Sequence, residues 1–138
     1  MKNVLLKNFV CLVCVAIILS AFSAYSFSVQ NEKEIGEKYT YLDSYKGTID
    51  HGIIKTTVSV KVIGKTNVTS IKIKMELQKL SSGSYSTVET WEQVFSGTQA
   101  YYSEDKVTNP LSTYRIKATV TAYAGSAYEQ KVFYVNEN

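Results

Sequence analysis

Apolar and polar side chains alternate along most of the chain from Tyr39 onward. This is the pattern of half-buried β-strands, and no window carries the sustained stripe of an amphipathic helix. The clearest examples are residues 71–80 (IKIKMELQKL) and 113–123 (TYRIKATVTAY). Successive side chains of a strand point to opposite faces, so one face of each stretch is expected in a core. In the first stretch the side chains expected to be buried are Ile71, Ile73, Met75 and Leu77.

Seven strands are predicted, separated by turns that are rich in glycine, serine and asparagine. Their expected bounds are residues 39–46, 54–63, 68–80, 85–95, 99–106, 113–123 and 127–135. In the second strand the residues expected to share a buried face are Ile54, Val58, Val60 and Val62. Gly47 and residues 50–52 (DHG) would turn the chain after the first strand.

The fourth predicted strand breaks the simple alternation. Tyr85, Val88 and Trp91 are spaced three residues apart, which indicates a β-bulge that changes the phase of the strand. Seven short strands with turns about every ten residues favour an all-β fold, a single antiparallel β-sandwich. A small β-barrel is the alternative.

The first residues have the features of a secretory signal peptide. Lys2 and Lys7 precede an apolar run at residues 9–19, which is short for a membrane span, and small residues follow it. We predict cleavage near Ser26, a flexible N-terminal arm over residues 27–38, and one domain over residues 39–138. The protein is therefore expected to be secreted and extracellular.

Removal of this leader changes the charge and the cysteine content. The full chain of 138 residues has a formal net charge of +3, and the leader carries two lysines and no acid, so the mature chain is close to +1. A nearly neutral domain gives no general case for nucleic-acid binding. Both cysteines, Cys11 and Cys14, lie in the leader, so the domain would fold without a disulfide.

Two resemblances support export and an all-β fold. Residues 111–135 (LSTYRIKATVTAYAGSAYEQKVFYV) resemble the last two strands of immunoglobulin-like and fibronectin type III domains, with Tyr114 at the tyrosine-corner position. The leader, YTYLDSYKGTI, VTSIKIKMELQKLSSGSYSTVETW and YRIKATVTAY together resemble an uncharacterised family of small secreted proteins of Gram-positive bacteria. The second resemblance implies no activity and no functional residues.

Residue types that carry catalysis are sparse. His51 is the single histidine, it lies in an expected turn, and no nucleophile motif accompanies it. Glu104 and Asp105 are adjacent, so they would point to opposite faces of a strand, and Glu89 and Glu92 are expected on a solvated strand face. We therefore expect no enzyme, no cofactor and no metal site, and a hydrolase with a carboxylate site remains the least favoured alternative.

Two groups of side chains are candidates for binding. In an immunoglobulin-like layout the third and sixth strands are neighbours, which would place four basic residues on one outer face: Lys72, Lys74, Arg115 and Lys117. Charges that only keep this face wet are the competing interpretation. The second group consists of aromatic residues that suit sugar or protein contact: Trp91, Tyr101 and Tyr102.

The sequence thus favours a secreted, non-enzymatic binding or interaction module whose ligand it does not name. A cell-wall polymer or a protein would be the partner, with no nucleic acid and no stable membrane insertion of the mature chain. A small secreted toxin, bacteriocin or inhibitor is the alternative, and it predicts an exposed apolar patch.

Overall fold

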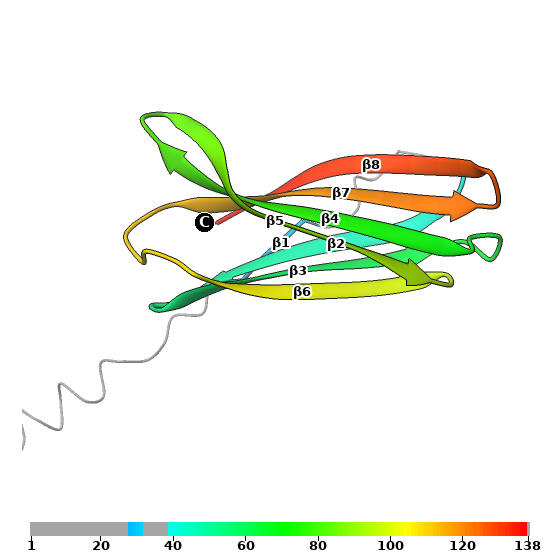
Figure 1. Ribbon diagram of the computed structural model, residues 1–138, viewed down its shortest axis with the longest axis horizontal. Helices are drawn as coiled ribbons and strands as arrows, with labels where there is room; N and C mark the ends of the chain where they lie inside the picture. The colour runs from blue at the N-terminus through cyan, green and yellow to red at the C-terminus, as the bar shows by residue number, and fades with distance from the viewer. Residues whose placement is uncertain (1–27, 32–38, 138) are drawn as a thin grey trace, which may run out of the picture.

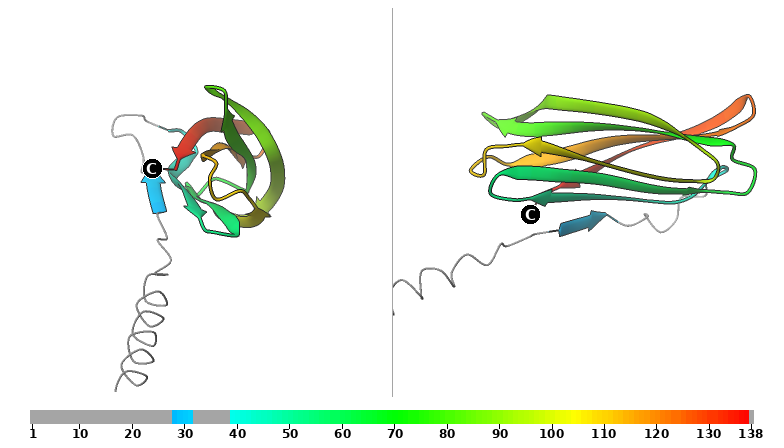
Figure 2. Two further views of the ribbon diagram at one scale, coloured as in Figure 1. Left: turned by 90° about the vertical axis from the view of Figure 1, so that its left-hand side faces the viewer. Right: turned by 60° about the horizontal axis from the view of Figure 1, so that its bottom comes forward.

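The computed structural model describes residues 28–31 and 39–137, and they form two packed antiparallel sheets (Figures 1 and 2). The first sheet has the strand order β1-β2-β3-β6 and the second has the order β5-β4-β7-β8. The strands of the first sheet are β1 (Ser28–Asn31), β2 (Leu42–His51), β3 (Lys55–Gly64) and β6 (Gln99–Val107). Those of the second are β4 (Ser70–Ser81), β5 (Ser84–Ser96), β7 (Tyr114–Ala124) and β8 (Ala127–Asn136).

This architecture confirms the predicted β-sandwich. The third and sixth predicted strands, now β4 and β7, are hydrogen-bonded neighbours, and the second, now β3, belongs to the other sheet. Among the described strands no backbone pairing joins one sheet to the other, so the alternative of a closed barrel is wrong. The predicted leader and residues 27 and 32–38 of the predicted arm lie outside the described residues, whereas residues 28–31 pair with β2.

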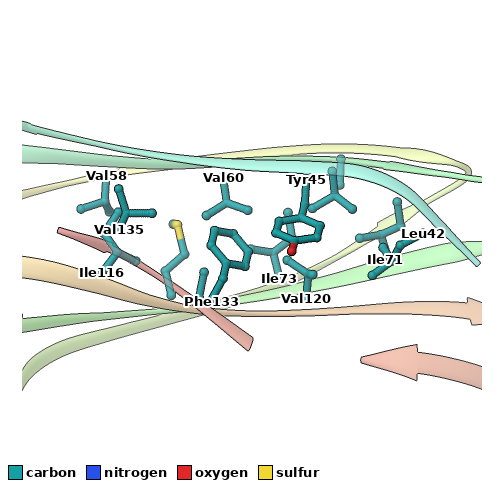
Figure 3. Close-up of a cluster of buried hydrophobic side chains, with 14 of the residues drawn as sticks. Leu42, Tyr45, Val58, Val60, Ile71, Ile73, Ile116, Val120, Phe133 and Val135 are labelled. Atoms are coloured by element: carbon teal, nitrogen blue, oxygen red, sulfur yellow. The ribbon is translucent and has the colours of Figure 1, made fainter. Parts of the chain in front are cut away.

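The core lies between the sheets and is built from the alternating positions that the sequence indicated (Figure 3). Every second residue of β4 from Ile71 to Leu77 is fully buried, as are the inward residues of β7 from Ile116 to Ala122. Val58, Val60 and Val62 of β3 face them from the first sheet. Burial of apolar surface is the main driving force for such a fold, and it is obtained here without cysteine in the described residues.

The start of the domain differs from the prediction in two places. The chain does not turn at Gly47, because β2 continues through it to His51. A Cβ atom at Gly47 would lie 2.6 Å from Cγ2 of Val135 and 2.9 Å from Cε2 of Phe133, so this glycine allows the two sheets to approach closely. Ile54 is not buried but 72% exposed, because β3 begins after it and Thr56 takes the first buried position of that strand.

The predicted bulge in the fourth strand is confirmed. Leu77 pairs with Glu89 and the next residue, Gln78, pairs with Thr87, which leaves Val88 as the extra residue on β5. A bulge bends its strand and increases the local twist. Figure 1 shows the β4–β5 hairpin bending away from the sandwich at this end.

The side chain of Tyr114 occupies the predicted tyrosine corner. Its hydroxyl accepts a hydrogen bond from the backbone amide of Asn109 at 3.3 Å, five residues upstream. The ring is buried and fixes the loop that links β6 to β7, at the end of the sandwich where β2 also ends. This is the feature for which residues 111–135 resemble immunoglobulin-like domains.

Glu129 of β8 joins the open edge of the second sheet to the start of the first. Its two carboxylate oxygens accept hydrogen bonds from the backbone amides of Thr40, Tyr41 and Leu42 at 2.7–2.9 Å. Burial acts to raise the pKa of Glu129, but the three amides and the charge of Lys65 outweigh it and lower the pKa below its ordinary value. An inward-pointing charge of this kind also protects an edge strand from pairing with other chains.

Replacing Glu129 with glutamine is expected to lower the free energy of unfolding at neutral pH by about 1–3 kcal/mol, since bonds to a charged acceptor are lost. A lowered folded-state pKa contributes stability above the unfolded-state value, and this contribution is lost as the pH falls through the folded-state pKa. The stability difference between wild type and variant should therefore shrink below about pH 4. Urea unfolding of both proteins from pH 7 to pH 3 measures it, and a difference that does not change with pH would contradict the assignment.

Candidate binding surface

The four basic residues predicted as a patch lie on the outer face of the β5-β4-β7-β8 sheet, but the register separates them. Lys72 and Lys74 of β4 stand opposite Thr121 and Thr119 of β7. Lys117 stands opposite Glu76, and Arg115 stands opposite Gln78. The two pairs of basic residues therefore occupy successive positions along the sheet instead of lying side by side.

Carboxylates neutralise much of this positive charge. Lys72 forms an ion pair with Glu92 of β5 at 3.1 Å, and Lys117 forms one with Glu76 at 3.3 Å. Lys74 stands directly opposite Glu92 across the β4–β5 pair. All of these side chains are at least partly solvent-exposed, so each pair contributes little to stability. Glu76 and Glu92 offset two of the four positive charges on this face, and the face stays net positive.

Arg115 differs from Lys72 and Lys117 because its charge has no carboxylate partner among the residues that the structure describes. Its guanidinium carbon lies 3.8 Å from the ring centroid of Tyr85 and 4.6 Å from that of Tyr134. Tyr85 belongs to β5 and Tyr134 to β8, so the rings approach from the two edge strands. The Nε–H of Arg115 donates a hydrogen bond to Oε1 of Gln78 at 2.7 Å.

The cluster of Arg115, Tyr85, Tyr134 and Gln78, which we call the arginine cluster, thus reaches across all four strands of the sheet. Gln78 is buried beneath it, although its position in β4 faces outward, and its amide nitrogen donates to the hydroxyl of Thr87 at 3.3 Å. Contact with two rings and one hydrogen bond restricts the guanidinium, while Arg115 stays half-buried and within reach of solvent. Because this cation is already restricted in the free protein, it loses little conformational entropy when a ligand binds.

The predicted aromatic candidates divide between core and surface. Tyr101 is 62% exposed on the outer face of the other sheet, whereas its neighbour Tyr102 points inward and packs edge-on against Phe95 at 5.8 Å. Burial and the nearby Glu104 raise the pKa of Tyr102. Trp91 stands opposite Met75 and packs against the core. Of the three candidates, Tyr101 is therefore the one most available to a ligand.

Three of the carboxylates considered for catalysis take part in ion pairs at the surface: Glu89, Glu92 and Asp105. Glu89 accepts a hydrogen bond from Nζ of Lys106 at 2.6 Å, and this bond and the amide of Thr90 lower its pKa. Asp105 forms an ion pair with Lys55 and accepts a bond from Thr57 at 2.6 Å, and both contacts lower its pKa. A general acid needs a raised pKa, whereas the pKa values of Glu89 and Asp105 are lowered.

The single histidine lies against the C-terminal end of β8. His51 is the last residue of β2 rather than part of a turn, and its ring packs on that of Tyr114 at 5.2 Å between centroids. Its Nδ1 contacts one carboxylate oxygen of Glu137, whose other oxygen accepts a hydrogen bond from the backbone amide of Tyr114 at 2.8 Å. No serine or cysteine nucleophile is bonded to His51 in the described part of the chain.

Across residues 28–31 and 39–137, no group of three or more histidine, cysteine, aspartate or glutamate side chains is placed to hold a metal ion. The same residues contain no helix long and apolar enough to cross a membrane.

Sequence reasoning missed Tyr85, Tyr134 and Gln78 as members of a site. In the sequence, Tyr85 is distinguished only by its spacing from Val88, and Tyr134 only by its place in the last predicted strand. The available signal was compositional: Arg115 is the single arginine in a chain with 14 lysines. A lone arginine at an outward position of a strand is a reason to ask which side chains require a guanidinium.

Comparison of the chain with models of known protein families and with curated proteins finds no match. The resemblances to secreted Gram-positive proteins and to fibronectin type III domains therefore stay predictions from the sequence.

Proposed function

We propose that the protein is a secreted, non-enzymatic binding module that contacts a ligand of the cell envelope with the outer face of the β5-β4-β7-β8 sheet. The observation that carries the proposal is the arginine cluster, in which a half-buried guanidinium without a carboxylate partner in the described chain lies against two tyrosine rings. Arginine and tyrosine are the residues most enriched at the energetic centres of interfaces.

The rest of this face supports the proposal. The two edge strands carry exposed apolar side chains beside the ion pairs of this face. They include Val94 of β5 and Tyr128 and Val132 of β8. Tyr128 is 64% exposed and its ring lies 6.0 Å from that of Tyr123 on β7. Since Glu76 and Glu92 offset two of the four positive charges, recognition by this face would depend on ring and guanidinium contacts as well as on net charge.

The test is retention of the mature chain on purified Gram-positive cell walls, before and after removal of their anionic polymer, across a salt series. We expect retention that depends weakly on salt and that falls about fivefold or more when Tyr128 and Val132 are both replaced by serine. The matched control is Tyr101→Ser, which removes an equally exposed tyrosine from the other sheet and should leave retention unchanged. Absence of retention, or equal retention of the two variants, would overturn the proposal.

A second candidate, a membrane-active secreted toxin, is favoured by a different observation. Four exposed apolar residues lie at the end of the sandwich where β2 and β6 finish: Ile53, Ile54, Val107 and Leu111. Val107 pairs with Lys55 next to Ile54, and the amide of Thr108 donates to the carbonyl of Ile54 at 3.3 Å. Adding dye-loaded lipid vesicles to the same assay separates the candidates, because dye release by the wild type would favour the toxin.

A further inference from the structure

Arg115 stands out in a chain whose other basic residues are all lysines. The sequence contains 14 lysines and this one arginine. A lysine keeps a sheet face soluble as well as an arginine does, but only a guanidinium is planar and presents several N–H groups in a fixed fork. The position of Arg115 therefore calls for an explanation that uses this geometry.

The contacts of Arg115 leave most of its donors unused. Tyr85 and Tyr134 contact the guanidinium, and Gln78 takes the Nε–H. The two terminal nitrogens have no hydrogen-bond or ion-pair partner among the described residues. They carry four N–H donors.

We propose that the terminal nitrogens of Arg115 bind a carboxylate group of the ligand in a two-point contact. This inference rests on the proposed function, because it names the chemical group that the outer face of the β5-β4-β7-β8 sheet recognises. A carboxylate matches the fork of a guanidinium with two parallel N–H···O bonds, and such contacts are stronger than those between neutral groups.

The surroundings select a planar monoanion over a phosphate. The nearest lysine on β7, Lys117, already pairs with Glu76. Glu76 lies two residues before Gln78 on β4, on the same face of the sheet. A phosphate with nearly two negative charges would find only the charge of Arg115 to balance it at this position, and the carboxylate of Glu76 would repel it. A carboxylate carries a single charge, and its flat shape suits a planar guanidinium that lies against two tyrosine rings.

A purely structural role for the arginine cluster makes a different prediction. If Arg115 served only to tie the edge strands β5 and β8 to the middle of the sheet, the ring contacts and the bond to Gln78 would suffice, and its terminal nitrogens would bind no anion. Stability measurements alone do not separate the two roles. A direct readout at the guanidinium does.

The experiment follows the N–H signals of the arginine side chain by NMR in the ¹⁵N-labelled mature protein, where a single arginine makes the assignment unambiguous. The probes are glucuronate for an acidic sugar and N-acetylglycine for a peptide terminus, with their methyl esters as uncharged controls and inorganic phosphate as the competing geometry. We expect saturable shifts with one or both carboxylates, with dissociation constants of about a millimolar, and at least tenfold weaker binding of esters and phosphate. The stronger of the two carboxylates identifies the source.

Two variants secure the result. Arg115→Lys keeps the charge and should weaken carboxylate binding at least tenfold, as followed by the backbone amide signals of β7 and β8. Gln78→Glu places a carboxylate of the protein beside the guanidinium, where it competes with the ligand. This variant should also weaken carboxylate binding at least tenfold, while the domain stays folded. Lys72→Gln is the matched control, since it removes a charge from the same face and should change affinity less than twofold.

Unchanged arginine signals at 50 mM carboxylate, or equal affinity of wild type and Gln78→Glu, would overturn the inference. This failure differs from failure of the proposed function. Cell-wall retention that depends on Tyr128 and Val132 but not on Arg115 would keep the binding face and remove the carboxylate.

Discussion

Replacement of Ile73 by alanine is expected to lower the free energy of unfolding by about 2–5 kcal/mol. Ile73 lies in the middle of β4, is fully buried, and is paired across the sheet with Val120 (Figure 3). Removing its outer carbon atoms loses their transfer free energy and leaves a cavity that the surrounding strands fill only in part. Urea or thermal unfolding of the purified protein measures the loss.

The neighbouring residue is the matched control. Lys74→Ala changes the next position of the same strand, which faces outward and forms no salt bridge with any described residue, so the expected change stays within about 0.5 kcal/mol. Ile73→Val, which removes one methylene group, should fall between the two at about 0.5–1.5 kcal/mol. Equal effects of Ile73→Ala and Lys74→Ala would mean that the two faces of β4 have been assigned wrongly.

The second large effect is expected at Gly47, where any side chain meets the opposite sheet. We expect Gly47→Ala to cost about 1–3 kcal/mol and Gly47→Val more, because a Cβ atom would lie 2.6 Å from Cγ2 of Val135 and the strands would have to separate. This reverses the usual gain from replacing a strand glycine by a residue with a higher β-propensity. Thermal unfolding should show a lower midpoint, by about 4–8 °C for each kcal/mol.

A double-mutant cycle shows whether the clash is the cause. Val135→Ala removes the methyl group that the new Cβ would meet, so the double variant Gly47→Ala/Val135→Ala should be more stable than the sum of the single effects predicts, by about 1 kcal/mol or more. Additive effects would show that Gly47 is required for another reason, such as its backbone conformation.

The alternation of apolar and polar residues was enough to predict most of the fold. It gave the seven strands β2 to β8, the buried residues of β4 and β7, and the bulge in β5, because side chains on a strand alternate with a period of two and a bulge changes that phase visibly. It did not give β1, which falls in the segment expected to be a flexible arm and instead pairs with β2. The glycine- and serine-rich turn between the third and fourth predicted strands is the two-residue connection of Ser82 and Gly83 between β4 and β5, and both residues have positive φ angles. The turn predicted at Gly47 is wrong because this glycine lies within β2 and allows close packing between the sheets.

The candidate site could be predicted only in part. Lys72, Lys74, Arg115 and Lys117 do share one outer face, as the pattern indicated, but the pattern did not give their neighbours. A shift of β7 against β4 by two residues leaves every side chain on the same face and changes every cross-strand contact. The register therefore decides that Lys117 meets Glu76 and that Arg115 meets Gln78, and no local feature of either strand encodes it.

By itself, the sequence determined which side chains lie inside and which lie outside, because that distinction depends on local periodicity. Only the tertiary structure decided which outside residues meet, because strands distant in sequence must pair before Tyr85, Arg115 and Tyr134 can converge. For the same reason, two of the four basic residues of this face meet carboxylates that their own strands did not indicate: Lys72 meets Glu92 and Lys117 meets Glu76. What remains distinct on that face is the one guanidinium with no carboxylate beside it in the described chain.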